Sequence, residues 1–136
     1  MFVKDIMSPH VASVTQDDTA QNAAQIMKNN NIGALPVVSG NELCGIVTDR
    51  DIILRCVADG KSPDSCKISE VMTTSAATIE PDKTVTDAVT LMASEQVRRL
   101  PVVDNGQLVG IVSLCDVAKL RKNAEVANAL CEISMP

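Results

Sequence analysis

A hydroxyl residue and an aspartate stand three positions apart at two places in the chain, Thr48 with Asp51 and Ser113 with Asp116. A hydroxyl group can donate a hydrogen bond to a phosphate oxygen, and a carboxylate can accept two bonds from the vicinal hydroxyls of a ribose. Where a strand runs into a helix, the unpaired N–H groups of the helix start also favour an anion. The pattern therefore suits a ligand that carries a phosphate beside a ribose.

The same spacing has a second interpretation that needs no ligand. Ser/Thr-x-x-Asp at a helix start resembles a capping box, in which each side chain satisfies the backbone N–H of the other residue. The spacing alone favours capping over ligand binding. The two roles are compatible, because a cap can rearrange when a ligand binds.

Both motifs close a longer stretch that occurs twice, 65 positions apart. Gly45-Ile46-Val47 precedes Thr48 as Gly110-Ile111-Val112 precedes Ser113. The same offset aligns most of the chain with itself without a gap, including Leu35–Val38 with Leu100–Val103. A half of about 60 residues buries too little surface to be stable alone, so we expect the two halves to share a core.

Each copy opens with a short extended segment, at residues 11–14 and 76–79. Apolar residues at helical spacing then follow Thr19 and Thr84 and predict amphipathic helices of about ten residues. Both threonines are good N-caps, and Thr84 with Asp87 resembles a capping box.

Two strands follow in each copy, at residues 35–38 and 43–47 of the first. The corresponding turn of the second copy contains Asn105-Gly106, which is a strong hairpin signal. Thr48 and Ser113 then begin a further helix. Each copy therefore predicts the order β-α-β-β-α, and the fold class is α/β (α+β) with two repeats related by pseudo-twofold symmetry.

The predicted organisation has four parts. They are a first repeat at residues 1–60, a polar linker at 61–67, a second repeat at 68–123 and a C-terminal helical tail at 124–136.

The composition narrows the possible functions. The formal net charge is −5, and the chain has one Phe and no Tyr or Trp, so we expect no nucleic-acid interface. No apolar stretch approaches about 18 residues, and the N-terminus lacks the apolar run of a signal peptide, which predicts a cytoplasmic protein without a membrane span. The sequence offers no Cys/His or Ser/His/Asp constellation and no Walker-type loop, so we expect no enzyme.

The cysteines predict neither a zinc site nor a disulfide framework. None of them is spaced as C-x-x-C, and the single histidine, His10, has no cysteine near it. We expect free thiols in a reducing cytosol, and no metal ion. Cys115 replaces Arg50 of the first motif, and we expect an inert, half-buried cysteine; a redox-sensitive thiol beside a ligand is the alternative. The five cysteines are Cys44, Cys56, Cys66, Cys115 and Cys131.

The repeated Met-Ser/Thr, Leu-Pro-Val-Val and Gly-Ile-Val-Thr/Ser stretches, the last followed three residues later by an aspartate, resemble a tandem CBS (cystathionine β-synthase type) domain pair. The resemblance is to free-standing prokaryotic pairs and covers roughly Val3 to Lys122. It implies two repeats packed through their sheets into one module, commonly a homodimer. It also implies binding of AMP, ADP, ATP or S-adenosylmethionine in clefts between the repeats, with no cofactor required.

The resemblance assigns roles to particular residues. Thr48, Asp51, Ser113 and Asp116 would contact the phosphate and the ribose. An adenine pocket would be lined by Ala12, Ser13, Ala34, Leu35, Pro36, Ala77, Thr78, Leu100 and Pro101, although plain strand core is an equally good interpretation of these strand residues.

The copies differ where Gly33-Ala34 of the first becomes Arg98-Arg99 in the second. One of these guanidinium groups could reach a phosphate, preferably of a di- or triphosphate. A solvated pair of arginines is the alternative. The difference predicts two unequal sites.

We therefore expect a regulatory module that senses an adenosine nucleotide and changes conformation for an unknown regulated partner. The alternative is a scaffold that dimerises or docks a partner without a ligand. The apolar stripe of the tail favours that alternative, since Leu120, Ala124, Ala127 and Cys131 would lie along one side of a helix.

Overall fold

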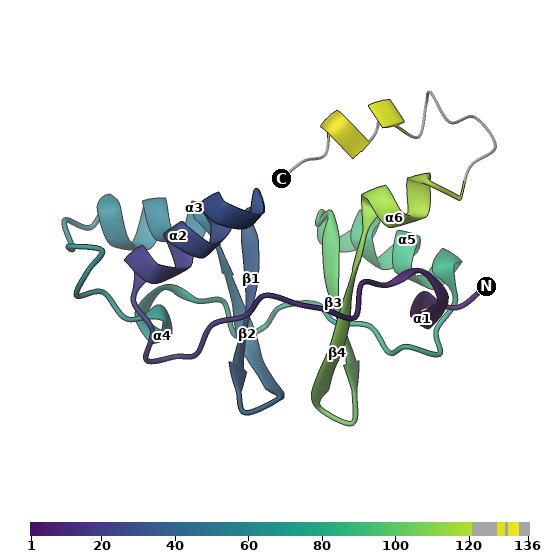
Figure 1. Cartoon of the computed structure of the whole chain (residues 1–136), viewed down its shortest axis with the longest axis horizontal. Coiled ribbons are helices and arrows are strands. Elements are labelled where there is room, and N and C mark those ends of the chain that lie inside the picture. Colours follow the sequence, from purple (N-terminus) through teal and green to yellow (C-terminus); the bar gives the residue numbers. More distant parts are fainter. Residues whose placement is uncertain (121–127, 130, 134–136) are drawn as a thin grey trace. The chain divides into compact units, whose positions relative to one another are not determined.

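The computed structural model describes residues 1–120, 128–129 and 131–133, and these form two compact units (Figure 1). The first-repeat unit is Ala12–Ala76. The second-repeat unit combines Met1–Val11 with the chain from Ala77 onwards. Each unit contains one long helix, a two-stranded hairpin and a short helix directly after the hairpin. The predicted α/β class with two repeats is confirmed.

The first-repeat unit contains α2 (Ala20–Asn30), β1 (Ala34–Ser39), β2 (Glu42–Thr48), α3 (Asp49–Ile52), the π-helix η1 (Ile53–Val57) and α4 (Ile68–Val71). The second-repeat unit contains α1 (Val3–Ile6), α5 (Val85–Glu95), β3 (Arg99–Asp104), β4 (Gln107–Ser113) and α6 (Leu114–Ala118). In Figure 1 the turn of each hairpin points away from the long helix of its unit.

The two long helices begin and end where local sequence signals place them. The Asn22 N–H donates to Thr19 Oγ1 at 3.1 Å at the start of α2. Thr84 and Asp87 form the predicted capping box at the start of α5. Helix α2 ends at Asn31, whose φ of 53° and ψ of 49° lie in the left-handed region that asparagine tolerates.

The hairpins set which residues face each other at the helix end of each unit. Ala34 lies opposite Thr48 in the antiparallel β1–β2 pair, and Arg99 lies opposite Ser113 in the β3–β4 pair. The predicted Asn105-Gly106 turn has φ values of 52° and 82°, as a type I′ turn requires. The first residue of one strand is thereby placed beside the hydroxyl residue that ends the other.

The segments predicted as first strands are shorter than expected. Val14 and Ile79 each form a single parallel bridge to the neighbouring strand. The Val14 N–H donates to the Pro36 carbonyl at 3.0 Å, and the Ile79 N–H donates to the Pro101 carbonyl at 3.0 Å. The residues before them therefore run alongside β1 and β3.

The leader of each repeat, residues 3–8 and 68–73, packs on the unit built around the other repeat. Ser8 pairs with Ile111 of β4, and Thr73 pairs with Ile46 of β2. The repeat pattern does not indicate this exchange, nor the short helices α1 and α4 that the leaders form. The predicted domain boundaries follow the sequence repeats and stay a prediction.

Gly45 and Gly110, which open the repeated motifs, lie where the leaders cross the strands. A Cβ at Gly45 would lie 2.5 Å from the carbonyl oxygen of Thr73. A Cβ at Gly110 would lie 2.7 Å from Met7 Sδ and 2.8 Å from the carbonyl oxygen of Ser8. These glycines therefore permit the close approach of the leader backbone to the strand.

Each unit has an apolar core of its own, in place of the single shared core expected from the sequence. Each core nevertheless draws on both repeats, since Val3 is buried in the second-repeat unit and Ile68 and Val71 are buried in the first-repeat unit. The buried residues are aliphatic side chains, Met, Ala and Cys, as the near absence of aromatic residues requires.

Two further features bear on the predicted helices. The helix that follows Thr48 begins as α3 and continues as the π-helix η1. The predicted tail at 124–136 falls mostly outside the described residues. Within the tail, the described residues 131–133 are helical. None of the described helices has the length and apolar character needed to cross a membrane.

Candidate functional site

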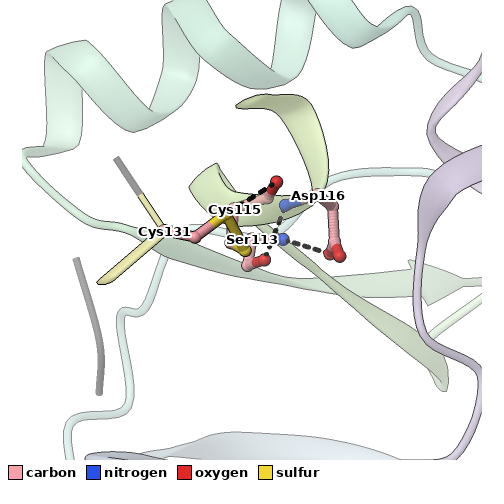
Figure 2. The surroundings of a disulfide bond; sticks show 4 residues. All are labelled: Ser113, Cys115, Asp116 and Cys131. Atoms are coloured by element: carbon pink, nitrogen blue, oxygen red, sulfur yellow. Dashed lines mark hydrogen bonds between the residues drawn. A yellow bond between two sulfur atoms is a disulfide. The ribbon is translucent and has the colours of Figure 1, made fainter. Parts of the chain in front are cut away.

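The two Ser/Thr-x-x-Asp motifs form capping boxes. At the start of α3 the Asp51 N–H donates to Thr48 Oγ1, and the Thr48 N–H donates to Asp51 Oδ2, both at 3.0 Å. Ser113 and Asp116 repeat these bonds at the start of α6, at 3.1 and 2.9 Å (Figure 2). All four residues are half-buried. The capping interpretation therefore holds in both motifs, and a ligand that uses these groups has to displace the cap bonds.

The residue before each hairpin is tied to the helix start. The Asp49 N–H donates to the Gly33 carbonyl at 2.9 Å, and the Leu114 N–H donates to the Arg98 carbonyl at 2.8 Å. This bond fixes the chain that enters β1 or β3 against the first turn of α3 or α6. The predicted pocket segment and the predicted phosphate-binding turn of each repeat are therefore neighbours.

Within each unit the residues predicted to bind ligand gather at one end of the hairpin. In the first-repeat unit Ala34 lies opposite Thr48, and Ala12-Ser13 lead into the bridge beside β1. The second-repeat unit repeats the arrangement with Arg99, Ser113 and the segment Ala77-Thr78.

Four of the predicted pocket residues are core residues. Their side chains are almost fully buried, and the two proline carbonyls accept the bridge bonds described above. They can shape a site, but they leave polar contacts to the half-buried or exposed residues around them. The four are Leu35, Pro36, Leu100 and Pro101. The half-buried residues are Ala12, Ser13, Ala34 and Ala77, and Thr78 is exposed.

The two arginines of the second repeat differ in their surroundings. Arg98 is exposed and Arg99 is half-buried. Burial lowers the pKa of the Arg99 guanidinium, the charge of Arg98 lowers it further, and the charge of Asp116 opposes both effects. Arg99 therefore places a cation close to the carboxylate of the second motif, where the first repeat has Ala34.

Arg55 is a site residue that the sequence analysis missed. Its Nη1 lies 3.9 Å from Asp51 Oδ1 and donates to the carbonyls of Val71 and Met72 at 3.1 and 3.2 Å. An arginine four residues after an aspartate on a helix is the local signal that could have identified the pair. Leu120 occupies the equivalent position of the second repeat, so each motif aspartate has a different arginine near it.

The expectation of free thiols is wrong for two of the five cysteines. Cys115 and Cys131 form a disulfide that links the first turn of α6 to the C-terminal segment (Figure 2). The spacing of 16 residues carries no signal of this bond, because the pairing depends on how the segment folds back onto α6. Cys44, Cys56 and Cys66 are free.

Two clefts lie in the described part of the chain, and neither is lined by the hydroxyl residue or the aspartate of a motif. A cleft of about 420 Å³ in the second-repeat unit is lined by α5 and by residues 78–83. Another of about 370 Å³ in the first-repeat unit lies between α2 and α3, with Met27, Ile32 and Ile52 in its wall. Among the described residues, no group of three or more His, Cys, Asp or Glu side chains could hold a metal ion.

Comparison with known proteins gives a consistent result along almost the whole chain. A family model described as the CBS domain matches residues 3–57 and again residues 68–123. The CBS domain-containing protein YhcV of Bacillus subtilis is 46% identical over 133 residues, which cover 97% of this chain and 94% of that protein. Hypoxic response protein 1 of Mycobacterium tuberculosis is 35% identical over 117 residues, which cover 85% of this chain and 82% of that protein.

Solved structures agree. The crystal structure of Hypoxic Response Protein I with two coordinated zinc ions is 34% identical, with a TM-score of 0.80 over 89% of this chain and 99% of that chain. The CBS domain pair of protein MJ0100 was solved in complex with 5′-methylthioadenosine and S-adenosyl-L-methionine. It is 32% identical, with a TM-score of 0.78 over 88% of this chain and 94% of that chain.

Proposed function

The chain belongs to the CBS domain family and carries two copies of the domain, and from this premise we propose that it is a regulatory module that binds an adenosine-containing ligand. The observation that supports the proposal is that both copies keep a hydroxyl residue and an aspartate at the strand-to-helix junction, beside the predicted adenine segments. The bound adenosine compounds of the MJ0100 pair have the ribose that such an aspartate would recognise.

Binding would exchange the internal cap for bonds to the ligand. The Thr48 and Ser113 hydroxyls would turn from the backbone N–H to a phosphate or another polar group of the ligand. Asp51 and Asp116 would accept the ribose hydroxyls. Loss of a cap costs about 1 kcal/mol, whereas each hydrogen bond to a charged group contributes about 1.5–3 kcal/mol. Replacing the cap with two hydrogen bonds to the ligand is therefore favourable.

The two sites would select ligands of different charge. Arg99 lies near Asp116 in the second-repeat unit, and exposed Arg98 adds a second cation. The first-repeat unit has Ala34 in place of Arg99, while Arg55 is already bound to carbonyl groups of α4 and the residue after it. We therefore assign ADP or ATP to the second site, and AMP or the singly charged S-adenosylmethionine to the first.

Thermal unfolding with AMP, ADP, ATP and S-adenosylmethionine tests the proposal. A ligand at about 100 times its Kd should stabilise the protein by about 2.7 kcal/mol. Asp51→Asn and Asp116→Asn should each abolish one site. Asp87→Asn is the matched control, because it removes the carboxylate of a capping box with the same geometry that includes none of the residues predicted to bind ligand.

All three variants should lose similar amounts of stability through the cap, and only the first two should lose ligand affinity. The proposal fails if none of the four ligands shifts the transition. It also fails if the ligand affinities of Asp51→Asn and Asp116→Asn match that of Asp87→Asn, because the aspartates would then be caps alone.

We further propose that the module works as a cytoplasmic homodimer and signals to a regulated protein through a ligand-dependent change in conformation. The scaffold alternative has one observation in its favour. The π-helix η1 exposes Ile53, Leu54 and Val57 to 57%, 47% and 56%, and adjacent exposed apolar residues mark interaction surfaces. If the dimer forms through this surface, Leu54→Glu should dissociate it. If the protein acts fully on its partner in the absence of any ligand, the scaffold alternative is favoured over the sensor.

A further inference from the structure

The Cys115–Cys131 disulfide ties the described part of the C-terminal segment to α6. Of residues 128–129 and 131–133, Cys131 alone is buried, at 7% exposure, and Ile133 is 77% exposed. Cys131 packs against Cys115 and Ala118 and against no other described apolar cluster. Among these residues, contact with α6 is therefore centred on the bonded cysteine itself.

The segment covers a helix face that is open in the other repeat. Ala118 is 4% exposed beneath Cys131, whereas its repeat equivalent Ile53 is 57% exposed. Cys115 is half-buried, whereas its equivalent Arg50 is exposed. With the bond in place, this part of α6 is therefore covered, whereas the equivalent part of α3 and η1 is open.

The chain also contains two buried cysteines that are free. Cys56 and Cys66 are buried at 0% and 2% exposure in the first-repeat core, and they interact with each other. Burial, with the neighbouring Cys56 and Glu70, raises the pKa of the Cys66 thiol to about 11, so little thiolate forms near neutral pH. The oxidised pair, in contrast, includes the half-buried Cys115, whose sulfur an attacking thiolate can approach.

We propose that Cys115 and Cys131 are a reversible redox modification site, and that a dithiol reductant opens it and releases residues 131–133 from α6. A thiolate of the reductant attacks Cys115 Sγ, and Cys131 leaves as a thiolate that takes up a proton. The second thiol of the reductant then displaces Cys115, so that two electrons pass to the protein and the reductant becomes a disulfide. This step rests on the cytoplasmic location proposed above, where protein disulfides are usually transient.

The test needs no nucleotide, so its result is independent of the proposed function. The full chain is equilibrated with graded ratios of reduced to oxidised dithiothreitol, quenched with acid, unfolded and labelled with a maleimide. Mass spectrometry should count three labels under oxidising conditions, at Cys44, Cys56 and Cys66. It should count five under reducing conditions, and reoxidation should restore three.

Segment release is measured by hydrogen exchange of the α6 amides, including that of Lys119, which donates to the Cys115 carbonyl at 3.1 Å. Exchange should rise at least tenfold on reduction. Cys131→Ser should show the fast exchange without a reductant, and Cys115→Ser provides a second open variant. Cys56→Ser is the matched control: it should lose one label in either condition, keep the difference of two labels between the conditions, and leave the α6 exchange unchanged.

Two results would overturn the proposal. One is a label count that stays at three at every ratio, or at five at every ratio, since the bond would then be permanent or absent. The other is α6 exchange that does not differ between the oxidised chain and Cys131→Ser, since the bond would then not control the segment.

Discussion

Replacing Gly45 with alanine should destabilise the first-repeat unit, because the new Cβ would collide with the leader that packs on β2. The new Cβ would lie 2.5 Å from the carbonyl oxygen of Thr73 and 3.3 Å from its carbonyl carbon. Favourable heavy-atom contacts need about 3.5 Å, so the two backbones have to separate by about 1 Å. The Ile46 N–H to Thr73 carbonyl bond, at 2.9 Å, would then lengthen beyond hydrogen-bonding distance.

The magnitude follows from the contacts that are lost. Thr73 and Ile46 exchange two backbone hydrogen bonds, each worth about 1 kcal/mol net. Overpacking adds about 1–3 kcal/mol, and the stiffer unfolded chain returns about 0.4–1 kcal/mol. The expected loss is about 3 kcal/mol, which for a chain of this size lowers the thermal midpoint by roughly 10 °C.

Urea unfolding followed by circular dichroism measures this loss, and hydrogen exchange at Ile46 and Thr73 locates it. Gly40→Ala is the control, because Gly40 lies in a turn with a φ of +62° and nothing within 4 Å of its Cβ position. It should lose only about 1–2 kcal/mol through the left-handed backbone. If Gly45→Ala is no worse than Gly40→Ala, the leader does not pack on β2 as described.

Three further outcomes are expected. Arg55→Met should lower the free energy of unfolding by about 1 kcal/mol, because the exposed guanidinium links Asp51 to the carbonyls at the end of α4. An unchanged urea midpoint would contradict this. The Thr84 N–H bond lowers the pKa of Asp87, so its carboxylate stabilises the fold above about pH 4 and that contribution disappears as pH falls through the lowered pKa. In Asp87→Asn the free energy of unfolding should therefore fall less steeply below about pH 4 than in the unchanged protein. Equal slopes for the two proteins would contradict this. Burial raises the pKa of Cys66 to about 11, so this thiol stabilises the fold at neutral pH and the contribution declines above about pH 8.5, where the unfolded thiol ionises. Iodoacetamide at pH 8 should leave Cys66 unlabelled until the chain is unfolded in guanidinium.

Elements specified by neighbouring residues were predictable from the sequence. The caps at Thr19 and Thr84 and the Asn105-Gly106 turn are local signals, and they place the long helices and the second hairpin correctly. The hairpin registers then bring the motif residues beside the strand starts, because the turn sets which residues face each other. The gathering of the candidate site residues within each unit follows from these short-range signals.

Features that depend on distant parts of the chain were not predictable in this way. Predicting the exchange of leaders would require knowing in which unit Val3 and Ile68 are buried. The sequence shows only that both residues are apolar. The Cys115–Cys131 bond depends on the path of the C-terminal segment. The bonds from Arg55 to the end of α4 join positions 16 and 17 residues apart, and no periodic pattern encodes such a contact.

The exchange of leaders also sets an order in which the chain can fold during synthesis. All of the first-repeat unit, Ala12–Ala76, leaves the ribosome as one continuous stretch. The N-terminal leader is made first, yet its partners arrive late, since the Val3 N–H binds the carbonyl of Lys83 and Ser8 pairs with Ile111. At translation rates of about 5–20 residues per second, Ser8 waits roughly 5–20 s for its strand. The oldest residues of the nascent chain are therefore among the last to dock, and a chain arrested near Ala76 would contain one complete unit and an unpaired leader.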